Sequence, residues 1–274
     1  MSGQPVAPPD AWADTPALAP AWRRFASRIA TMCLVELRKV RHDPTELYVR
    51  ALQPALWLLI FGVTFSRVHA IPTGNVPYLD FLAPGIMAQS ALFIAIFYGI
   101  QIIWERDAGI LTKLLSTPTP RVALVAGKAF AAGVRATSQV VVVLVLSAAL
   151  GVHLRWNPLG LLGVVAVVVL GSAFFATLSV TIAGLVRSRD RLMGIGQAIT
   201  MPLFFASNAL YPVDIMPAWL RAISHVNPLS YEVDALRALL LGTPGNLAVD
   251  AVALVVAAAA GIGAAAALLD RLAR

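Results

Sequence analysis

Charged residues are scarce in this chain. Of its 274 residues, 13% are Asp, Glu, Lys or Arg and 59% are hydrophobic. An ordinary soluble domain carries about 25% charged residues, so this sequence lacks the polar surface that a protein needs in water. The composition therefore excludes a water-soluble protein and predicts a protein of the lipid bilayer.

Cysteine and histidine are also rare. Cys33 is the single cysteine, which excludes a disulfide within the chain and removes any need for an oxidising compartment. The four histidines, His42, His69, His153 and His225, are scattered without the spacing of metal ligands. We therefore expect no metal site.

Catalytic motifs are missing as well. The sequence has no G-x-S-x-G elbow, no H-E-x-x-H and no paired carboxylates within an apolar run. The pair Gly127-Lys128 is like the end of a P-loop, but Ala129 replaces the required Ser or Thr and Val122 stands where the first Gly belongs. Acidic and histidine proton relays are also lacking. We therefore expect a non-catalytic protein that binds no cofactor itself, and whose energy for any uphill transport comes from another subunit.

The chain does contain a series of long apolar runs. Residues 1–20 hold five prolines and no Lys or Arg, and they are predicted to be a disordered tail before one domain, residues 21–274. The domain has six uncharged runs: Ala51–Ser66, Phe81–Trp104, Ala136–Val152, Trp156–Val186, Leu192–Val213 and Ala251–Leu269. Because a helix needs about 20 apolar residues to cross a bilayer, we expect an all-α polytopic membrane protein with six transmembrane helices. The fifth run contains Gly194, Gly196 and Pro202 and is predicted to be irregular, so five or seven spans are the alternatives.

The basic residues are distributed unevenly around these runs. Six spans put both termini on one side, and that side holds 17 of the 21 Lys and Arg residues. The positive-inside rule then predicts that both termini are cytoplasmic. The net charge of +7 is explained as a topology signal, and we expect no binding to nucleic acid.

Residues 22–41 have the pattern of a basic amphipathic helix. Apolar residues recur every three or four positions from Trp22 to Val40, and six Arg and Lys residues occupy much of the remainder. Trp and Arg together suit the headgroup boundary, which favours a helix along the membrane surface. The alternative is a solvated helix that packs on other parts of the same protein.

The longest polar interruption, Trp104–Arg121, follows the second run. Glu105 and Arg106 lie at the inner end of the span, and the Thr-Pro-Thr-Pro sequence at residues 117–120 is predicted to end a short helix. Between them lies an apolar patch at helical spacing: Ile110, Leu111, Leu114 and Leu115. Such a helix either contacts a partner protein or dips its leucines into the headgroup zone, and periodicity alone does not separate the two.

Three motifs in this order resemble those of a known family. The first is E-R-x-x-G-x-L-x-x-L-L-x-T-P-x-P-R at residues 105–121, and the second is a proline-rich segment at residues 211–241. The third is Glu36-Leu37 in the basic helix, followed by Arg50 and Gln53-Pro54. Together they resemble type-2 ABC transporter permeases, in particular the daunorubicin-resistance-like multidrug exporters, over about residues 22–270.

The resemblance implies a six-span permease that forms a homodimer or heterodimer on two ATP-binding-cassette subunits, which bind ATP and Mg²⁺. It implies that the interface helix, residues 22–41, and the cytoplasmic loop, residues 105–121, contact the ATPase. The implied coupling residues are Arg38, Arg41, Glu105, Arg106, Gly109, Leu111 and Leu114. Residues 211–241 would be short external helices that re-enter the outer leaflet, although prolines that shape an ordinary loop are the alternative. The implied external signature is Tyr211, Pro212, Pro217, Asn227, Pro228 and Arg237.

The functional expectation is ATP-driven export across the inner membrane of a bacterium. Because the spans offer few charges, the expected substrate is hydrophobic or amphipathic, such as a drug or a lipid, with a lipid-linked polysaccharide as an alternative. Export of drugs would make the protein part of a multidrug efflux system for antibiotic resistance. The rival hypotheses are a secondary transporter or channel that works without an ATPase, and a structural membrane subunit with no solute path.

Overall fold

A computed structural model of the protein describes residues 20–42, 45–68, 71–74, 76–116, 120–186 and 188–273. All regular structure within these ranges is helical, which confirms the prediction of an all-α protein. The elements are α1 (Ala21–His42), α2 (Thr45–Leu56), η2 (Trp57–Gly62), α3 (Val63–Val68), α4 (Tyr78–Asp107), α5 (Ile110–Leu115), α6 (Arg121–Ala149), α7 (Pro158–Val186), α8 (Arg189–Phe205), η3 (Val213–Ile215), α9 (Ala218–Val226), α10 (Pro228–Leu241) and α11 (Leu247–Ala273). The predicted disordered tail lies outside the described residues, apart from Pro20.

Five helical segments in the described part of the chain are long and apolar enough to cross a membrane. They are Val49–Val68, Tyr78–Asp107, Arg121–Ala149, Pro158–Val186 and Leu247–Leu269. These segments coincide with the first, second, third, fourth and sixth predicted runs. By length and composition, the chain is a multi-pass membrane protein.

The fifth predicted run forms a shorter helix than its length suggested. Helix α8 has 17 residues, which is about 25 Å of helix, and Pro202 lies in its last turn. After Phe205 the chain continues in turns as far as Pro212. The prediction of an irregular fifth segment is confirmed, but the helix does not extend to Val213, and α8 is not among the five candidate spans.

The third span begins earlier than predicted. In the sequence, Lys128 and Arg135 precede the uncharged run that begins at Ala136. Helix α6 nevertheless starts at Arg121 and contains both residues. Lys128 is only 8% exposed. The helix tolerates this charge because a carboxylate from α4 pairs with it, as described below.

The first span is not a uniform α-helix. A π-helical stretch, η2, separates α2 from α3. Pro54 lies inside α2, three residues before this stretch. Because proline has no N–H group and its ring crowds the preceding turn, it disturbs the regular hydrogen bonding of the helix around it.

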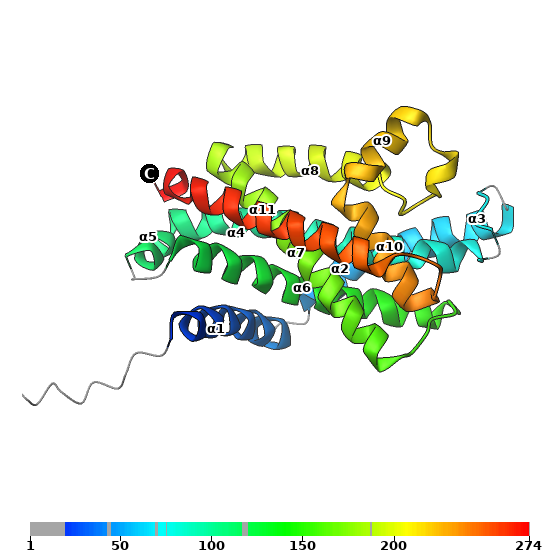
Figure 1. Ribbon diagram of the computed structural model, residues 1–274, viewed down its shortest axis with the longest axis horizontal. Coiled ribbons are helices and arrows are strands. Elements are labelled where there is room, and N and C mark those ends of the chain that lie inside the picture. Colours follow the sequence, from blue (N-terminus) through cyan, green and yellow to red (C-terminus); the bar gives the residue numbers. More distant parts are fainter. Residues whose placement is uncertain are drawn as a thin grey trace, which may run out of the picture.

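Helix α7 lies at the centre of the bundle, where it packs against α4, α6, α10 and α11 (Figure 1). Small residues allow α7 and α4 to approach closely. A Cβ atom at Gly99 would lie 2.0 Å from Ser179 Oγ, and that hydroxyl donates a hydrogen bond of 2.5 Å to Ile96 O. Close contact through small residues is the usual way for helices to associate in a membrane.

The bundle has two distinct ends (Figure 1). Helix α5, the start of α1 and the end of α11 lie toward one end, and α3 and α9 lie toward the other. We call them the α5 end and the α9 end. Helix α1 lies outside the bundle and packs against α6. The loop at residues 105–121 and the segment at residues 211–241 are therefore at opposite ends.

Candidate coupling surface and external segment

A tight turn at Gly109 begins the short helix of the loop. Helix α4 ends at Asp107, and Gly109 follows with a φ of 71°. This left-handed conformation favours glycine, because a side chain would clash with the backbone. Gly109 N donates a hydrogen bond of 2.9 Å to Arg106 O, and α5 starts at the next residue. Residues 117–119, which contain the predicted stop signal, lie outside the described residues.

The apolar face of α5 is divided between the core and the surface. Leu111 is completely buried, Leu114 is half-buried and Ile110 is 48% exposed. Leu111 therefore reaches neither a partner nor the headgroup zone, which were the two alternatives for this apolar patch. Helix α5 folds back on α4, and Leu111 fills a core cluster with residues such as Leu192 and Leu269. Among the described apolar side chains of α5, Ile110 is the most exposed.

Glu105 does not lie free at the end of its helix. It forms an ion pair with Lys128 of α6, and both side chains are largely buried. The neighbouring Arg106 pairs with Asp107 at 2.8 Å. The last turn of α4, which leads into α5, is therefore tied by charge to α6.

Glu36 anchors α1 to the bundle. This carboxylate is 3% exposed and accepts a hydrogen bond of 3.3 Å from the Tyr98 hydroxyl of α4. Lys39 Nζ lies 2.8 Å from Glu36 Oε1, and Arg135 of α6 lies 3.9 Å from the other oxygen. The interface helix is thus joined to two candidate spans, and its exposed residue Arg38 is left on the surface.

Helix α1 packs on other parts of the same protein, as the second alternative for residues 22–41 predicts. Met32 packs on α6, where a Cβ atom at Gly127 would lie 2.3 Å from the Met32 sulfur. The other face leaves Trp22 and Leu37 exposed, and Arg41 is exposed in the last turn. A helix with exposed Trp, Leu and Arg on one face and protein on the other suits the edge of a membrane protein at the headgroup level.

At the α9 end, the last turn of α8 has no following turn to satisfy its carbonyl groups. The carbonyl groups of residues 202–205 therefore need hydrogen-bond donors from outside the helix. The chain supplies two of them locally. Ala206 N donates to Pro202 O at 2.8 Å, and Ser207 N and Oγ donate to Phe204 O at 3.2 and 2.7 Å.

Two residues of the predicted external signature supply the remaining donors. Asn227 Nδ2 donates to Leu203 O at 2.7 Å and to Ala206 O at 3.3 Å. The Tyr211 hydroxyl donates to Phe205 O. All four carbonyl groups of the last turn are therefore paired, and the contacts from Tyr211 and Asn227 let α8 end at Phe205.

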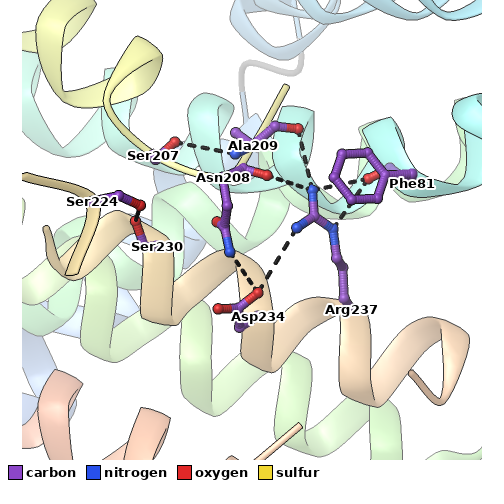
Figure 2. A network of polar contacts seen from close by, with 8 residues as sticks. All are labelled: Phe81, Ser207, Asn208, Ala209, Ser224, Ser230, Asp234 and Arg237. Atoms are coloured by element: carbon purple, nitrogen blue, oxygen red, sulfur yellow. Dashed lines mark hydrogen bonds and ion pairs between the residues drawn. The ribbon is translucent and has the colours of Figure 1, made fainter. Parts of the chain in front are cut away.

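Arg237 of α10 holds the turn that follows α8 (Figure 2). Its guanidinium donates to the carbonyl oxygens of Asn208 at 2.6 Å and of Ala209 and Phe81 at 3.3 Å, and it lies 3.6 Å from the centre of the Phe81 ring. Asp234, one turn earlier, lies 3.8 Å from the guanidinium and accepts a bond of 2.6 Å from the Asn208 side chain. One buried cation therefore joins α10, α4 and the end of α8.

The signature prolines start the short helices of this segment. Pro212 precedes η3, Pro217 precedes α9 and Pro228 is the first residue of α10. Proline suits these positions because the first N–H groups of a helix have no partner within it. Asn227 completes the start of α10, since its side chain accepts a bond of 3.1 Å from Leu229 N.

Burial changes the acidity of three groups in α10. Desolvation lowers the pKa of Arg237 to about 10, so this group stays charged at neutral pH. Burial raises the pKa of Asp234, although Arg237 and the bond from Asn208 oppose the change. Burial raises the pKa of the completely buried Glu232 well above its ordinary value. Glu232 lies against Gly171 of α7, where a Cβ atom would lie 2.2 Å from the carboxylate.

Several residues that hold helices together at the two ends could not be singled out by the motifs. The sequence presents Glu36 only as part of a motif, Lys128 only as part of an incomplete P-loop, and Asn208 in no motif. Lys128 is a charge within a mostly apolar helix, and Glu36 is the only acidic residue of a basic helix. These are the signals that could have identified them, since such a charge needs a partner. In the described part of the chain, no group of three or more His, Cys, Asp or Glu side chains is placed to hold a metal ion.

Comparisons with known proteins find a matching family and several relatives. The family described as ABC-2 type transporter matches residues 28–241. The chain is 31% identical over 211 residues to the ycf38 transport permease of Cyanophora paradoxa, covering 73% of this chain and 70% of the relative. It is 26% identical over 205 residues to the daunorubicin resistance ABC transporter permease protein DrrB1 of Streptomyces coeruleorubidus, covering 75% and 72%. It is 32% identical over 185 residues to nodulation protein J of Rhizobium leguminosarum bv. trifolii, covering 67% and 68%.

Proposed function

The chain belongs to the ABC-2 type transporter family, and we propose that it is the membrane subunit of an ATP-driven exporter. In this proposal two copies of the permease, or this permease and a related one, sit on two ATP-binding-cassette subunits. Those subunits bind ATP and Mg²⁺ and carry out the hydrolysis. The permease itself is not an enzyme.

The observation that carries the proposal is the linkage of the α1 and α5 surface to the spans. Glu36 joins α1 to Tyr98 of α4. Glu105, in the last turn of α4, pairs with Lys128 of α6. A partner that moves α1 or α5 would therefore move α4 and α6 with them. ATP binding would shift the permease between two packings through this linkage.

The proposed contact surface has two parts, which are Ile110 and Lys113 of α5 and the exposed basic residues Arg38 and Arg41 near the end of α1. Glu105, Arg106, Gly109, Leu111 and Leu114 act behind it, by holding α5 in place. Exposed apolar and basic side chains on short helices are suited to docking on another protein. The coupling role is thus assigned to a surface and to the residues that position it.

We also propose six crossings with both termini in the cytoplasm. Helix α8 is the additional crossing, and its short length fits because residues 206–210 are all buried within the protein. Backbone outside a helix is tolerated at membrane depth only where protein covers it. The start of α1 and the end of α11 lie toward the same end of the bundle, which an even number of crossings requires (Figure 1).

In this topology residues 211–241 are short external helices that dip back into the outer leaflet of a bacterial inner membrane. The carbonyl groups of α8 that Asn227 and Tyr211 satisfy support this placement. Labelling of single cysteines in a Cys33→Ser background tests the orientation. A membrane-impermeant maleimide should label Val226→Cys in intact cells and should label Ser116→Cys only after the membrane is opened. Labelling of Ser116→Cys in intact cells would reverse the assignment.

The substrate is hydrophobic or amphipathic, such as a drug or a lipid. The spans support this by their composition, and the similarity to a daunorubicin resistance permease supports a role in multidrug efflux and antibiotic resistance. Proteoliposomes that contain the permease and a co-purified ATPase should move a fluorescent amphiphile only with ATP. Equal flux without ATPase, driven by an ion gradient, would favour the secondary transporter instead.

A further inference from the structure

A hollow of about 270 Å³ lies beside the middle of α4 and is lined by residues of α2, α4 and α6. These residues all lie within candidate spans. Each of the three helices contributes one glutamine to the wall: Gln53 of α2, Gln89 of α4 and Gln139 of α6. Because a polar group in an apolar environment is destabilising unless it is hydrogen-bonded, amides from three spans at one hollow need partners there.

Two of these amides are buried and carry atoms that no described residue bonds. Gln139 is 1% exposed, and in the described part of the chain neither its Nε2 nor its Oε1 atom has a hydrogen-bond partner. Gln89 is 2% exposed, and its Nε2 atom likewise has no partner among the described residues. Such atoms call for an explanation. Since both residues line the hollow, rotation about their side-chain bonds can turn the amides toward a bound molecule.

The unpaired atoms specify which hydrogen bonds an occupant has to offer. Two of them are amide nitrogens, which donate, and one is the amide oxygen of Gln139, which accepts. A carboxylate has no hydrogen to donate and would leave that oxygen unpaired, whereas an ammonium group cannot accept and would leave both nitrogens unpaired. A carboxamide or a hydroxyl group both accepts and donates. Such a group can therefore pair all three atoms.

The remaining wall and the depth of the hollow suit an uncharged molecule with an apolar part. The rings of Phe93 and Phe97 stack with their centres 6.2 Å apart, and Ile94 completes this side of the wall. An apolar part of the occupant would be buried against these side chains. A charged group is costly near the middle of a span. Arg50 also borders the hollow, but it already has an interaction of its own, so the bonds to the occupant are assigned to the amides.

We propose that this hollow binds an uncharged amphiphile through a carboxamide or hydroxyl group. The oxygen of that group accepts hydrogen bonds from the Nε2 atoms of Gln89 and Gln139, and its hydrogen is donated to Gln139 Oε1. This inference deepens the proposed function, on which it rests, by naming the polar group of the exported molecule. The molecule reaches the hollow from the bilayer, because the residues that line the hollow lie within candidate spans.

The test compares the binding of two uncharged probes to the permease alone, in phosphatidylcholine nanodiscs. The probes are dansyl-labelled undecanamide, which accepts and donates, and the dansyl-labelled methyl ester of undecanoic acid, whose ester group only accepts. Energy transfer from tryptophan to the dansyl group reports binding, and an excess of unlabelled undecanamide defines the part that is not specific. We expect the amide to bind about tenfold more tightly, because the ester leaves Gln139 Oε1 unpaired. Equal binding of the two probes would overturn the proposal.

Two variants assign the hydrogen bonds to individual residues. Gln139→Leu removes the acceptor, so the preference for the amide over the ester should disappear. Gln89→Leu removes a donor to the carbonyl oxygen that both probes carry, so it should weaken both probes by about tenfold and keep the preference. In both variants the melting temperature should stay the same or rise, because an amide with unpaired buried atoms is removed. A merely structural role of these residues would instead lower it.

Gln197→Leu, at an exposed position of α8, is the matched control and should bind both probes like the wild type. A preference for the amide that survives in Gln139→Leu would contradict the proposal. If Gln139→Leu does not fold, Gln139→Met, which keeps an unbranched side chain, takes its place. Since no ATPase or ATP is present, a failure to bind would reject the hollow and leave ATP-driven export standing. A failure of ATP-driven flux with the amide preference intact would reject export and leave the binding site.

Discussion

The ammonium group of Lys128 on α6 forms an ion pair with the carboxylate of Glu105 in the last turn of α4, and both side chains are largely buried. This pair fixes the point from which the chain turns into α5. With the contacts of Glu36, it links α1, α4 and α6 through buried charged side chains.

Breaking this ion pair should destabilise the permease. Glu105→Gln and Lys128→Met each leave one nearly buried charge unpaired, which costs about 3–5 kcal/mol. The double variant removes both charges and should recover most of that loss. Thermal unfolding of the four proteins in detergent measures the coupling between the two sites. Losses that simply add in the double variant would show that the residues do not interact.

The capping of α8 by Asn227 leads to a second prediction. Asn227→Leu leaves the carbonyl of Leu203 without its donor and should cost about 1–3 kcal/mol for each buried group left unpaired. Tyr211→Phe removes one donor from the more exposed Phe205 and should cost less. The control is Asn157→Leu, which removes an exposed cap from α7 and should cost about 1 kcal/mol. Thermal unfolding ranks the three variants, and an Asn227→Leu loss no larger than the control would contradict the account.

Glu232 makes the stability depend on pH. Because burial raises its pKa in the folded state, the group contributes most stability below its unfolded pKa of about 4.3, and this stability is lost as the pH rises through the folded pKa. The melting temperature should therefore be higher near pH 5 than near pH 8. Glu232→Gln should reduce that difference, whereas Asp214→Asn, at an exposed position, should leave it unchanged. Part of the difference in melting temperature should remain in Glu232→Gln, since the pKa of Asp234 is raised too. An equal difference in the wild type and in Glu232→Gln would show that Glu232 is not its cause.

The sequence was a good guide to the long helices and a poor one to the contacts between them. Apolar runs identified the five candidate spans, because a bilayer imposes length and composition on each helix separately. The end of α8 at Phe205 could not be predicted, since it depends on Asn227, which lies 22 residues further along the chain. The burial of Leu111 was missed for a related reason. Periodicity identifies an apolar face, but only the packing of α5 on α4 decides whether that face points inward.

The central claim is that the surface formed by α1 and α5 transmits the movement of an ATPase to the spans. The most direct measurement is the ATP turnover of the permease–ATPase complex with Ile110→Asp, compared with Val226→Asp at the opposite end of the bundle. Both residues are exposed, so neither change should lower the melting temperature by much. Leu111→Asp would be a poorer test, because it would place a charge in the core. We predict that Ile110→Asp loses co-purification with the ATPase, or about nine-tenths of substrate-stimulated turnover, a loss worth about 1.4 kcal/mol. Val226→Asp should behave like the wild type, and a fully coupled Ile110→Asp complex would contradict the account.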